Sequence, residues 1–226
     1  MKENEKKLQM LLSIYPELSV AECELLAENS HEIEYNTGEI IFKESAITSH
    51  VFFINQGLVK LVREHKNNRT IILDIVPGGQ FIGFVSLMGT KQYYNSAKAI
   101  APCKILTLYS EVFVKVMVSN PAFTLRLIAE QSKQNLQLIN HLIQISQKQL
   151  PGRVADVLLF FNELYEKLEY SFPLSRRELA EFAGTSKESL IRTLSEFNAD
   201  KIIEIIDNKK IKIKSLDIVE RLSKYG

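Results

Sequence analysis

The chain has 226 residues, of which 46% are hydrophobic and 24% charged, and its formal net charge at pH 7 is +1. This composition is that of an ordinary globular protein of one or two domains. A surface for nucleic acid must therefore be local, since residues 150–226 hold 13 Lys and Arg against 13 Asp and Glu.

The N-terminal segment and the cysteines bear on compartment and chemistry. The segment MKENEKKLQMLL lacks the continuous apolar core of a signal peptide, and no run approaches the roughly 18 apolar residues that span a bilayer. We therefore expect a cytoplasmic protein without a membrane partner. Cys23 and Cys103 lie far apart and without CxxC spacing, so no metal site or iron–sulfur cluster is predicted and both thiols are expected to be buried.

The first half of the chain changes from helical to strand-like patterns. Residues 1–29 have leucines at helical spacings and predict helix. From His31 onward, short β-branched and aromatic runs alternate with glycines. These runs cover residues 31–44, 50–64, 69–83 and 96–109. Such short strands predict an antiparallel barrel or jelly roll, with turns at Gly38 and Gly57 and a polar hairpin tip at residues 65–68.

A long helix is predicted after Tyr109, because the strand pattern stops there and Pro121 suits a first helical turn. Along it, small and apolar residues recur at alternating steps of three and four, as in a coiled-coil seam. The seam comprises Ala129, Ser132, Leu136, Ile139, Ile143, Ser146 and Leu150. We expect Leu136, Ile139 and Ile143 to pair two copies of the chain. A single core helix in a monomer is the alternative.

The C-terminal third begins and ends with recognisable boundaries. Pro151 and Gly152 break the helical pattern and predict a hinge, which an amphipathic helix over residues 152–167 follows. Near the end, residues 201–214 alternate apolar and polar on both sides of Asp207 and Asn208. This alternation predicts a β-hairpin, which would be the wing of a winged domain.

The segment SRRELAEFAGTSKESLIRTL predicts two short helices joined by a tight turn. Ser175 with Glu178, and Thr185 with Glu188, have the spacing of capping boxes at helix starts. Gly184 can end the first helix, because glycine adopts left-handed dihedrals without a Cβ penalty. Two helix starts ten residues apart with such a turn predict a helix-turn-helix.

The second of these helices is predicted to have one buried and one exposed face. Leu190, Leu194 and Phe197 recur at offsets of four and seven and form the buried stripe. The residues that fall on the other side are Lys187, Glu188, Ile191 and Arg192. Arginine can donate two hydrogen bonds to guanine and glutamate can accept one from cytosine, so this face suits base edges in a major groove. The alternative is a solvated surface on which Glu188 serves only as a cap.

We therefore predict an α+β fold with three parts. Residues 1–110 form a β-roll (jelly-roll) sensor domain with an N-terminal helical segment. Residues 111–149 form the long dimerisation helix and hinge, and residues 150–226 form a winged helix-turn-helix domain that binds DNA.

In this order of parts, the chain resembles the Crp/Fnr superfamily of bacterial transcription regulators over nearly its whole length. Residues 38–44, 52–61 and 77–83 are similar to the family's first β-roll turn, its central hairpin and the entry to its ligand-binding cassette. Residues 152–155 resemble the start of the DNA-binding domain, and residues 179–192 resemble the DNA-reading helices.

The resemblance implies a homodimeric transcription regulator that binds a pseudo-palindromic operator in double-stranded DNA. RNA polymerase is a further expected partner, and no enzymatic activity is expected. Lys187, Glu188 and Arg192 would contact bases, and Ile191 beside them could meet a thymine methyl group. The residues expected to contact phosphates are Ser175, Arg176, Thr185, Ser186 and Lys209.

The sensor half departs from the superfamily's cyclic-nucleotide binders. Those proteins pair a Gly-Glu-Leu with a downstream Arg-Ser-Ala, in which the glutamate takes the ribose hydroxyl and the arginine the phosphate. Here Phe84 stands for the glutamate and Asn95 for the arginine. A buried phosphate would lose its charge-assisted hydrogen bonds, so we expect no tight binding of cyclic AMP. The cysteine cluster of the oxygen-sensing branch is missing too.

An aromatic cassette remains, with no cofactor predicted and an unidentified effector. We expect it to take an apolar or planar molecule, or to be filled by its own side chains and be independent of ligand. The predicted pocket residues are Phe81, Gly83, Phe84, Val85, Tyr93, Tyr94, Asn95 and Ser96, with Leu87 and Met88 beside them. The alternative function is a ligand-binding or protein-interaction module that uses the winged domain as a docking surface.

Overall fold

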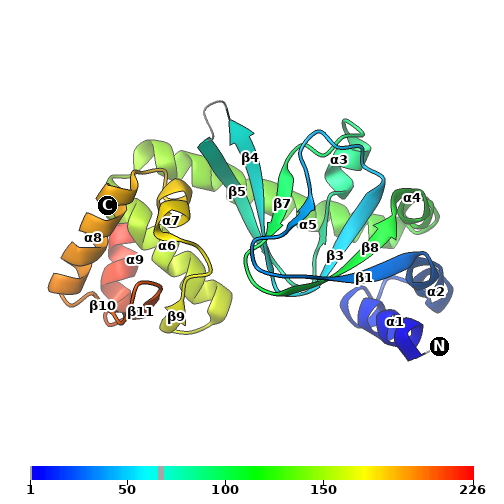
Figure 1. Cartoon of the computed structure of the whole chain (residues 1–226), viewed down its shortest axis with the longest axis horizontal. Helices are drawn as coiled ribbons and strands as arrows, with labels where there is room; N and C mark the ends of the chain where they lie inside the picture. The colour runs from blue at the N-terminus through cyan, green and yellow to red at the C-terminus, as the bar shows by residue number, and fades with distance from the viewer. Residues whose placement is uncertain (1, 66–68) are drawn as a thin grey trace. The chain divides into compact units, whose positions relative to one another are not determined.

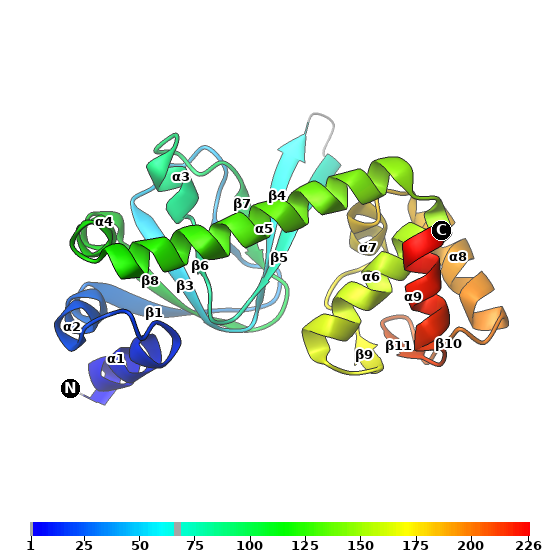
Figure 2. The ribbon, with the colours of Figure 1, turned by 180° about the vertical axis from the view of Figure 1, so that it is seen from behind.

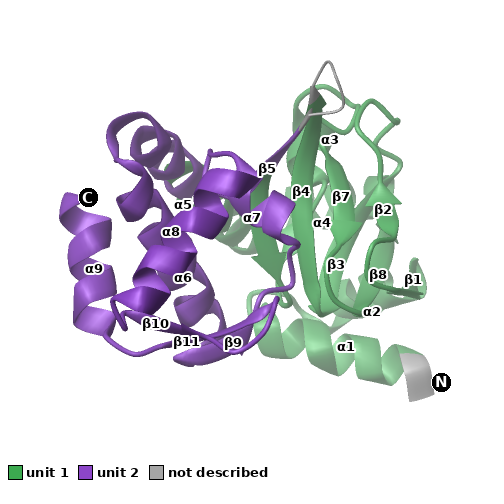
Figure 3. Cartoon of the chain, turned by 60° about the vertical axis from the view of Figure 1, so that its left-hand side comes forward, with its two compact units in different colours: residues 1–69, 73–136 green, residues 70–72, 137–226 purple. Residues whose placement is uncertain are grey.

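The computed structural model describes residues 2–65 and 69–226 (Figure 1). The chain divides into two compact units (Figure 3), one holding Met1–Arg69 and Leu73–Leu136, the other Thr70–Ile72 and Gln137–Gly226. The division therefore runs through the longest helix. The three-part division with limits at residues 110 and 149 stays a prediction.

Two helices form in the N-terminal segment that was predicted to be helical. Helix α1 covers Lys2–Ile14 and α2 covers Val20–Glu28. They are separate helices because Pro16 cannot continue a helix and Ser19 starts a new one. Ser19 forms a capping box with Glu22, whose carboxylate accepts from the Ser19 N–H at 2.9 Å.

Two four-stranded sheets form the predicted β-roll. One sheet has the order β1 (Ser30–Tyr35), β8 (Cys103–Tyr109), β3 (His50–Gln56) and β6 (Phe81–Ile82). The other has the order β2 (Ile40–Phe42), β7 (Ser96–Ala99), β4 (Leu58–His65) and β5 (Arg69–Pro77). Strand β8 pairs antiparallel with β1 and β3, as β7 does with β2 and β4. Residues 66–68 of the predicted hairpin tip lie outside the described residues.

Gly38 and Gly57 make the turns predicted for them, with φ of +97° and +106°. At Gly57 the surroundings also leave no room for a side chain. A Cβ there would lie 2.5 Å from the Pro102 carbonyl oxygen and 2.9 Å from the Cys103 Cα. Both neighbours are backbone atoms, which cannot move aside without shifting β8.

We expect Gly57→Ala to lower the free energy of unfolding by about 1–3 kcal/mol, because the strained φ and the backbone clash add. Urea denaturation would measure the loss. Gly79→Ala is a matched control, since Gly79 also has a positive φ of +92° but meets no atom within 4 Å. Equal losses in the two variants would contradict the clash at Gly57.

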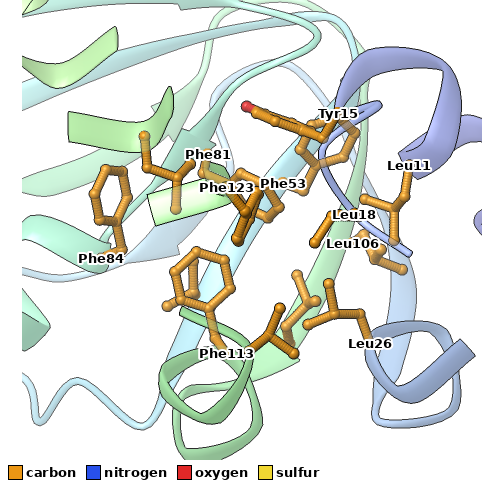
Figure 4. Close-up of a cluster of buried hydrophobic side chains, with 14 of the residues drawn as sticks. Leu11, Tyr15, Leu18, Leu26, Phe53, Phe81, Phe84, Leu106, Phe113 and Phe123 are labelled. Carbon is orange, nitrogen blue, oxygen red and sulfur yellow. The ribbon is translucent and has the colours of Figure 1, made fainter. Parts of the chain in front are cut away.

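The β-roll has a separate apolar core on each side of the β1-β8-β3-β6 sheet. Inside the roll, Phe42, Phe52 and Tyr93 pack with β-strand residues. Outside it, the sheet packs on α1, α2, α3 (Phe84–Met88), α4 (Ser110–Ser119) and the start of α5, with the aromatic rings seen in Figure 4. Both cysteines are free and buried, as predicted, and burial raises the pKa of the Cys23 thiol to about 11.

Helix α5 (Pro121–Gln147) is continuous over 27 residues and begins at the predicted proline (Figure 2). Helix α6 (Leu150–Tyr165) follows after two residues, and Pro151 and Gly152 lie inside its first turn. The predicted break is therefore displaced to residues 148–149. The reason is that proline is tolerated in a first turn, where its missing N–H would have no partner.

The C-terminal unit contains the predicted helix-turn-helix and wing. After α6, its helices are α7 (Arg176–Phe182), α8 (Lys187–Ala199) and α9 (Leu216–Tyr225), of which the sequence predicted α7 and α8. The predicted hairpin consists of β10 (Ile203–Ile205) and β11 (Lys210–Ile213), which pair antiparallel. Strand β9 (Glu169–Ser171), which was not predicted, pairs with the other edge of β11. The predicted α+β architecture is confirmed.

Among the described residues, no single helix has the length and apolarity needed to cross a membrane. Helices α4 and α5 satisfy those criteria only when taken as one broken segment, and they meet at 111°.

Candidate nucleic-acid interface

The first helix of the helix-turn-helix begins with the predicted capping box. The Ser175 Oγ accepts from the Glu178 N–H at 3.3 Å, and the Glu178 carboxylate accepts from the Ser175 N–H at 2.8 Å. The Ser175 hydroxyl also donates to that carboxylate at 2.7 Å. A phosphate contact from Ser175 would thus compete with Glu178.

The second capping box, predicted for Thr185 and Glu188, is wrong by one residue. Ser186 is the cap of α8, and its Oγ accepts from the Ser189 N–H at 3.1 Å. Thr185 stays in the turn, where its N–H donates to the Ala180 carbonyl at 2.9 Å. Lys187 and Glu188 are consequently the first two residues of α8, and Glu188 is exposed and has no capping role.

Helix α8 presents the four predicted base-contacting residues on one exposed face. Its other face buries Leu190, Thr193, Leu194 and Phe197. Lys187, Glu188 and Arg192 are exposed, and Ile191 is 42% exposed. The Arg192 Nε lies 4.0 Å from the Glu196 carboxylate, an exposed pair that contributes little energy and leaves the guanidinium free to contact DNA.

Arg176, predicted to contact a phosphate, is half-buried beneath the wing. Its guanidinium lies 5.5 Å from the centre of the Phe172 ring, and its Nη1 is buried without a hydrogen-bond partner among the described residues. Burial lowers the pKa of the Arg176 guanidinium, and the nearby Asp207 carboxylate opposes this shift. This environment suits a residue that supports the wing turn better than a free phosphate ligand.

Most of the positive charge of the wing is paired with carboxylates. Lys210 and Lys212 lie 2.6 and 3.5 Å from Glu169, and Lys214 lies 2.8 Å from Glu204. The hydrogen bond from Lys210 lowers the pKa of the Glu169 carboxyl. In the turn between β10 and β11, Lys209 is exposed and forms no such pair with the described residues, which makes it a cation that the wing turn can offer to a phosphate.

The predicted cassette residues do not line one pocket. Phe81 and Phe84 are buried in the core outside the roll, where Phe84 lies 6.1 Å from Phe113, centre to centre. Tyr93 lies inside the roll, stacked on Phe42 at 4.2 Å, and donates from its hydroxyl to the His50 carbonyl at 2.7 Å. Burial raises the pKa of the Tyr93 phenol.

The remaining cassette residues are exposed, form hydrogen bonds with backbone groups or cap a helix. Val85, Met88 and Tyr94 are exposed. The Ser96 Oγ accepts from the Glu44 N–H at 2.9 Å, and the Asn95 amide donates to the Ser96 carbonyl at 3.2 Å. Gly83 is the N-cap residue of α3, with φ +88°.

Arg63 was missed by the sequence analysis. It lies 4.1 Å above the Tyr94 ring and 3.1 Å from the Glu44 carboxylate, so the cation nearest this cassette residue is already neutralised. Nothing in the local sequence pairs Arg63 on β4 with Tyr94. Within the described ranges, no three His, Cys, Asp or Glu side chains cluster as metal ligands would.

The predicted seam of α5 is apolar and exposed. Leu136, Ile139 and Ile143 are 62%, 51% and 46% exposed, and Leu142 beside them is exposed as well. Within the helix, therefore, the three seam residues form a stripe that the chain itself leaves largely uncovered.

Two family models match the chain. The model of the cyclic nucleotide-binding domain matches residues 32–120, and that of the Crp-like helix-turn-helix domain matches residues 152–222. Over 200 residues the chain is 22% identical to the transcriptional activatory protein AadR of Rhodopseudomonas palustris, covering 86% of this chain and 82% of that protein. Over 171 residues it is 25% identical to the cyclic AMP receptor protein of Thermus thermophilus, covering 76% and 78%.

A solved structure has the same fold. FixK2 from Bradyrhizobium japonicum aligns with a TM-score of 0.77 at 19% identity, over 85% of this chain and 96% of that one. Together with the exposed face of α8, the matched helix-turn-helix domain and the relatives define a transcription regulator with a DNA-binding helix-turn-helix. The chain belongs to the Crp/Fnr superfamily, as its resemblance predicted.

Proposed function

We propose that this regulator acts as a homodimer that binds a pseudo-palindromic operator with two copies of α8. The observation that carries the proposal is the exposed stripe of Leu136, Ile139 and Ile143 on α5. Spacings of three and four let the same stripe of a second helix interdigitate with it. Each Å² of apolar surface covered in this way contributes about 25 cal/mol, which favours association.

Two-fold symmetry of the dimer sets the form of the operator. Two recognition helices related by that axis would enter the major groove at half-sites about one helical turn apart. Lys187, Glu188, Ile191 and Arg192 would read base edges in each half-site, and Ser186 and Lys209 would hold phosphates. RNA polymerase stays a predicted partner on the family resemblance.

Selection of binding sites from a random DNA library, followed by hydroxyl-radical footprinting, tests this proposal. We expect two inverted half-sites protected on one face of the duplex, and sedimentation equilibrium should give the mass of a dimer on one operator. A preferred site that consists of a single or an asymmetric half-site would contradict the symmetric dimer.

The β-roll is proposed not to bind cyclic AMP tightly. Phe84 is buried in the outer core, Asn95 carries no charge, and Arg63 is neutralised by Glu44. A phosphate in the cassette would have no free cation from these residues. The stacked Phe42 and Tyr93 rings also occupy the interior of the roll.

Isothermal titration with cyclic AMP should therefore give no saturable heat, and operator affinity should be the same with and without the nucleotide. Asn95→Arg, which restores the family's cation, is the comparison variant. Saturable binding to the wild-type chain would show that another group supplies the charge.

A further inference from the structure

The turn of the helix-turn-helix is held by the last turns of α5. The His141 ring stacks on the Phe182 ring at the end of α7, with centres 4.9 Å apart and planes at 24°. The imidazole N–H also donates to the Phe182 backbone carbonyl. Phe160 of α6 meets the same Phe182 ring edge-on at 5.2 Å, so this ring is fixed from two helices.

A second pair of contacts lies one helical turn further along α5. Gly184, in the turn, has φ +61°, and a Cβ there would lie 2.8 Å from the Ile145 Cγ2. Only glycine lets the turn approach α5 so closely. From α6, the Arg153 Nη1 donates to the Gly184 carbonyl at 2.7 Å.

These contacts fix the residues immediately before the recognition helix. Phe182 and Gly184 both offer their backbone carbonyls to side chains outside the helix-turn-helix, and α8 starts at Lys187, three residues after Gly184. A turn held at two carbonyls cannot rotate without breaking hydrogen bonds. The direction of α8 is therefore set by the end of α5.

We propose that His141 is a positioning residue for DNA recognition, which holds the helix-turn-helix turn against the end of α5 through its ring and its N–H. This inference rests on the proposed function, in which α5 also forms the dimer seam. The position of α8 then follows the position of the dimer helix, and dimer geometry is transmitted to the spacing of the two DNA-reading faces.

Because His141 can be protonated, its role in holding the turn is expected to depend on pH. Burial lowers the pKa of the imidazole, whereas the Asp156 carboxylate of α6 and the hydrogen bond to Phe182 oppose the shift. Asp156 is itself paired with Lys148 at 2.7 Å and accepts from the Ser223 hydroxyl at 2.6 Å, and Arg153 is engaged with Gly184. Protonation of His141 is therefore less favourable while the turn is packed against α5 than after the turn has moved away from it.

The direction of the pH effect follows from the linkage between protonation and stability. The stabilisation by neutral His141 is fully present above the unfolded pKa of about 6.5 and is lost as the pH falls through the lower folded value. No other histidine lies in residues 137–226, so no second imidazole of that unit contributes to the pH dependence.

The test compares His141→Leu and His141→Gln with the wild-type chain in fluorescence anisotropy on operator and on random DNA. At pH 7.5 we expect His141→Leu to weaken operator binding about tenfold, with random DNA unaffected. Glutamine, which keeps a donor for the Phe182 carbonyl, should restore part of the loss. Lowering the pH to 5.5 should weaken operator binding by the wild-type chain more than binding by His141→Leu. Asn140→Leu, at the exposed neighbouring position, is the control.

Operator affinity and pH dependence of His141→Leu equal to those of the wild type would overturn the proposal. So would an equal loss on random DNA, which would indicate general damage to the domain. These outcomes can be distinguished from a failure of the proposed homodimer, because the wild-type chain would then sediment as a monomer. In that case the variants compared on a single half-site still test the role of His141.

Discussion

Replacing Ile139 by lysine is expected to separate the proposed dimer into monomers and to weaken operator binding at least ~100-fold. Ile139 lies in the middle of the α5 stripe and is 51% exposed in the single chain. In a two-fold interface, a lysine there would face the same lysine of the second copy or its apolar neighbours. In a dimer, binding of one α8 to its half-site brings the second α8 close to the other half-site and raises its effective concentration there. A monomer loses this gain.

Sedimentation velocity measures the oligomeric state, and anisotropy on the operator measures the affinity. Asn140→Lys is the matched control, because it places the same charge on the next residue of the helix, which is exposed and polar. We expect Asn140→Lys to remain a dimer with wild-type affinity. A dimeric Ile139→Lys chain would place the interface away from this stripe.

Local chemistry decided how well the helix boundaries could be predicted. At Ser175 one hydroxyl and one glutamate have the required spacing, and the capping box forms there as predicted. At Thr185 and Ser186 two adjacent hydroxyls could each cap α8. The sequence favoured Thr185 because a glutamate stands three residues later. Ser186 caps α8 instead. The Thr185 N–H already donates to the Ala180 carbonyl, so it cannot donate to the Glu188 carboxylate as a capping box requires.

The cassette could not be predicted in the same way, because the strands around it are buried on both faces. In β3, the run Val51, Phe52, Phe53 and Ile54 is buried throughout, and alternate residues belong to the two different cores. The alternation that marks an inner face in a half-exposed strand is absent from such a run. Phe81 and Phe84 could therefore not be assigned to one core from their positions in the chain.

Charge pairing also depends on contacts between distant segments. The lysines of the wing alternate along the sequence as a basic cluster, but Glu169 on β9 pairs with two of them. Strand β9 was not predicted, so this neutralisation could not be predicted either. Lys209 keeps its charge for DNA because it lies in the turn before β11.

Arg192→Ala is expected to reduce affinity for the preferred operator by about 1–3 kcal/mol per half-site, which is roughly 5- to 150-fold, if Arg192 makes a bidentate contact to guanine. The loss should come with relaxed discrimination at one base pair in each half-site. The guanidinium is exposed on α8 and bound only weakly to Glu196, so its removal leaves the packing of α8 intact. Anisotropy with operators substituted one base pair at a time measures both effects.

Lys209→Ala is the informative comparison, because a phosphate contact and a base contact respond differently to sequence and salt. Lys209 lies on the wing without an ion pair among the described residues, and its removal should weaken all sequences alike and reduce the salt slope by about one. Arg192→Ala should instead leave binding to random DNA nearly unchanged. A loss from Arg192→Ala that is the same on operator and random DNA would assign Arg192 to the phosphates, and the exposed face of α8 would then read bases through Glu188 and its neighbours.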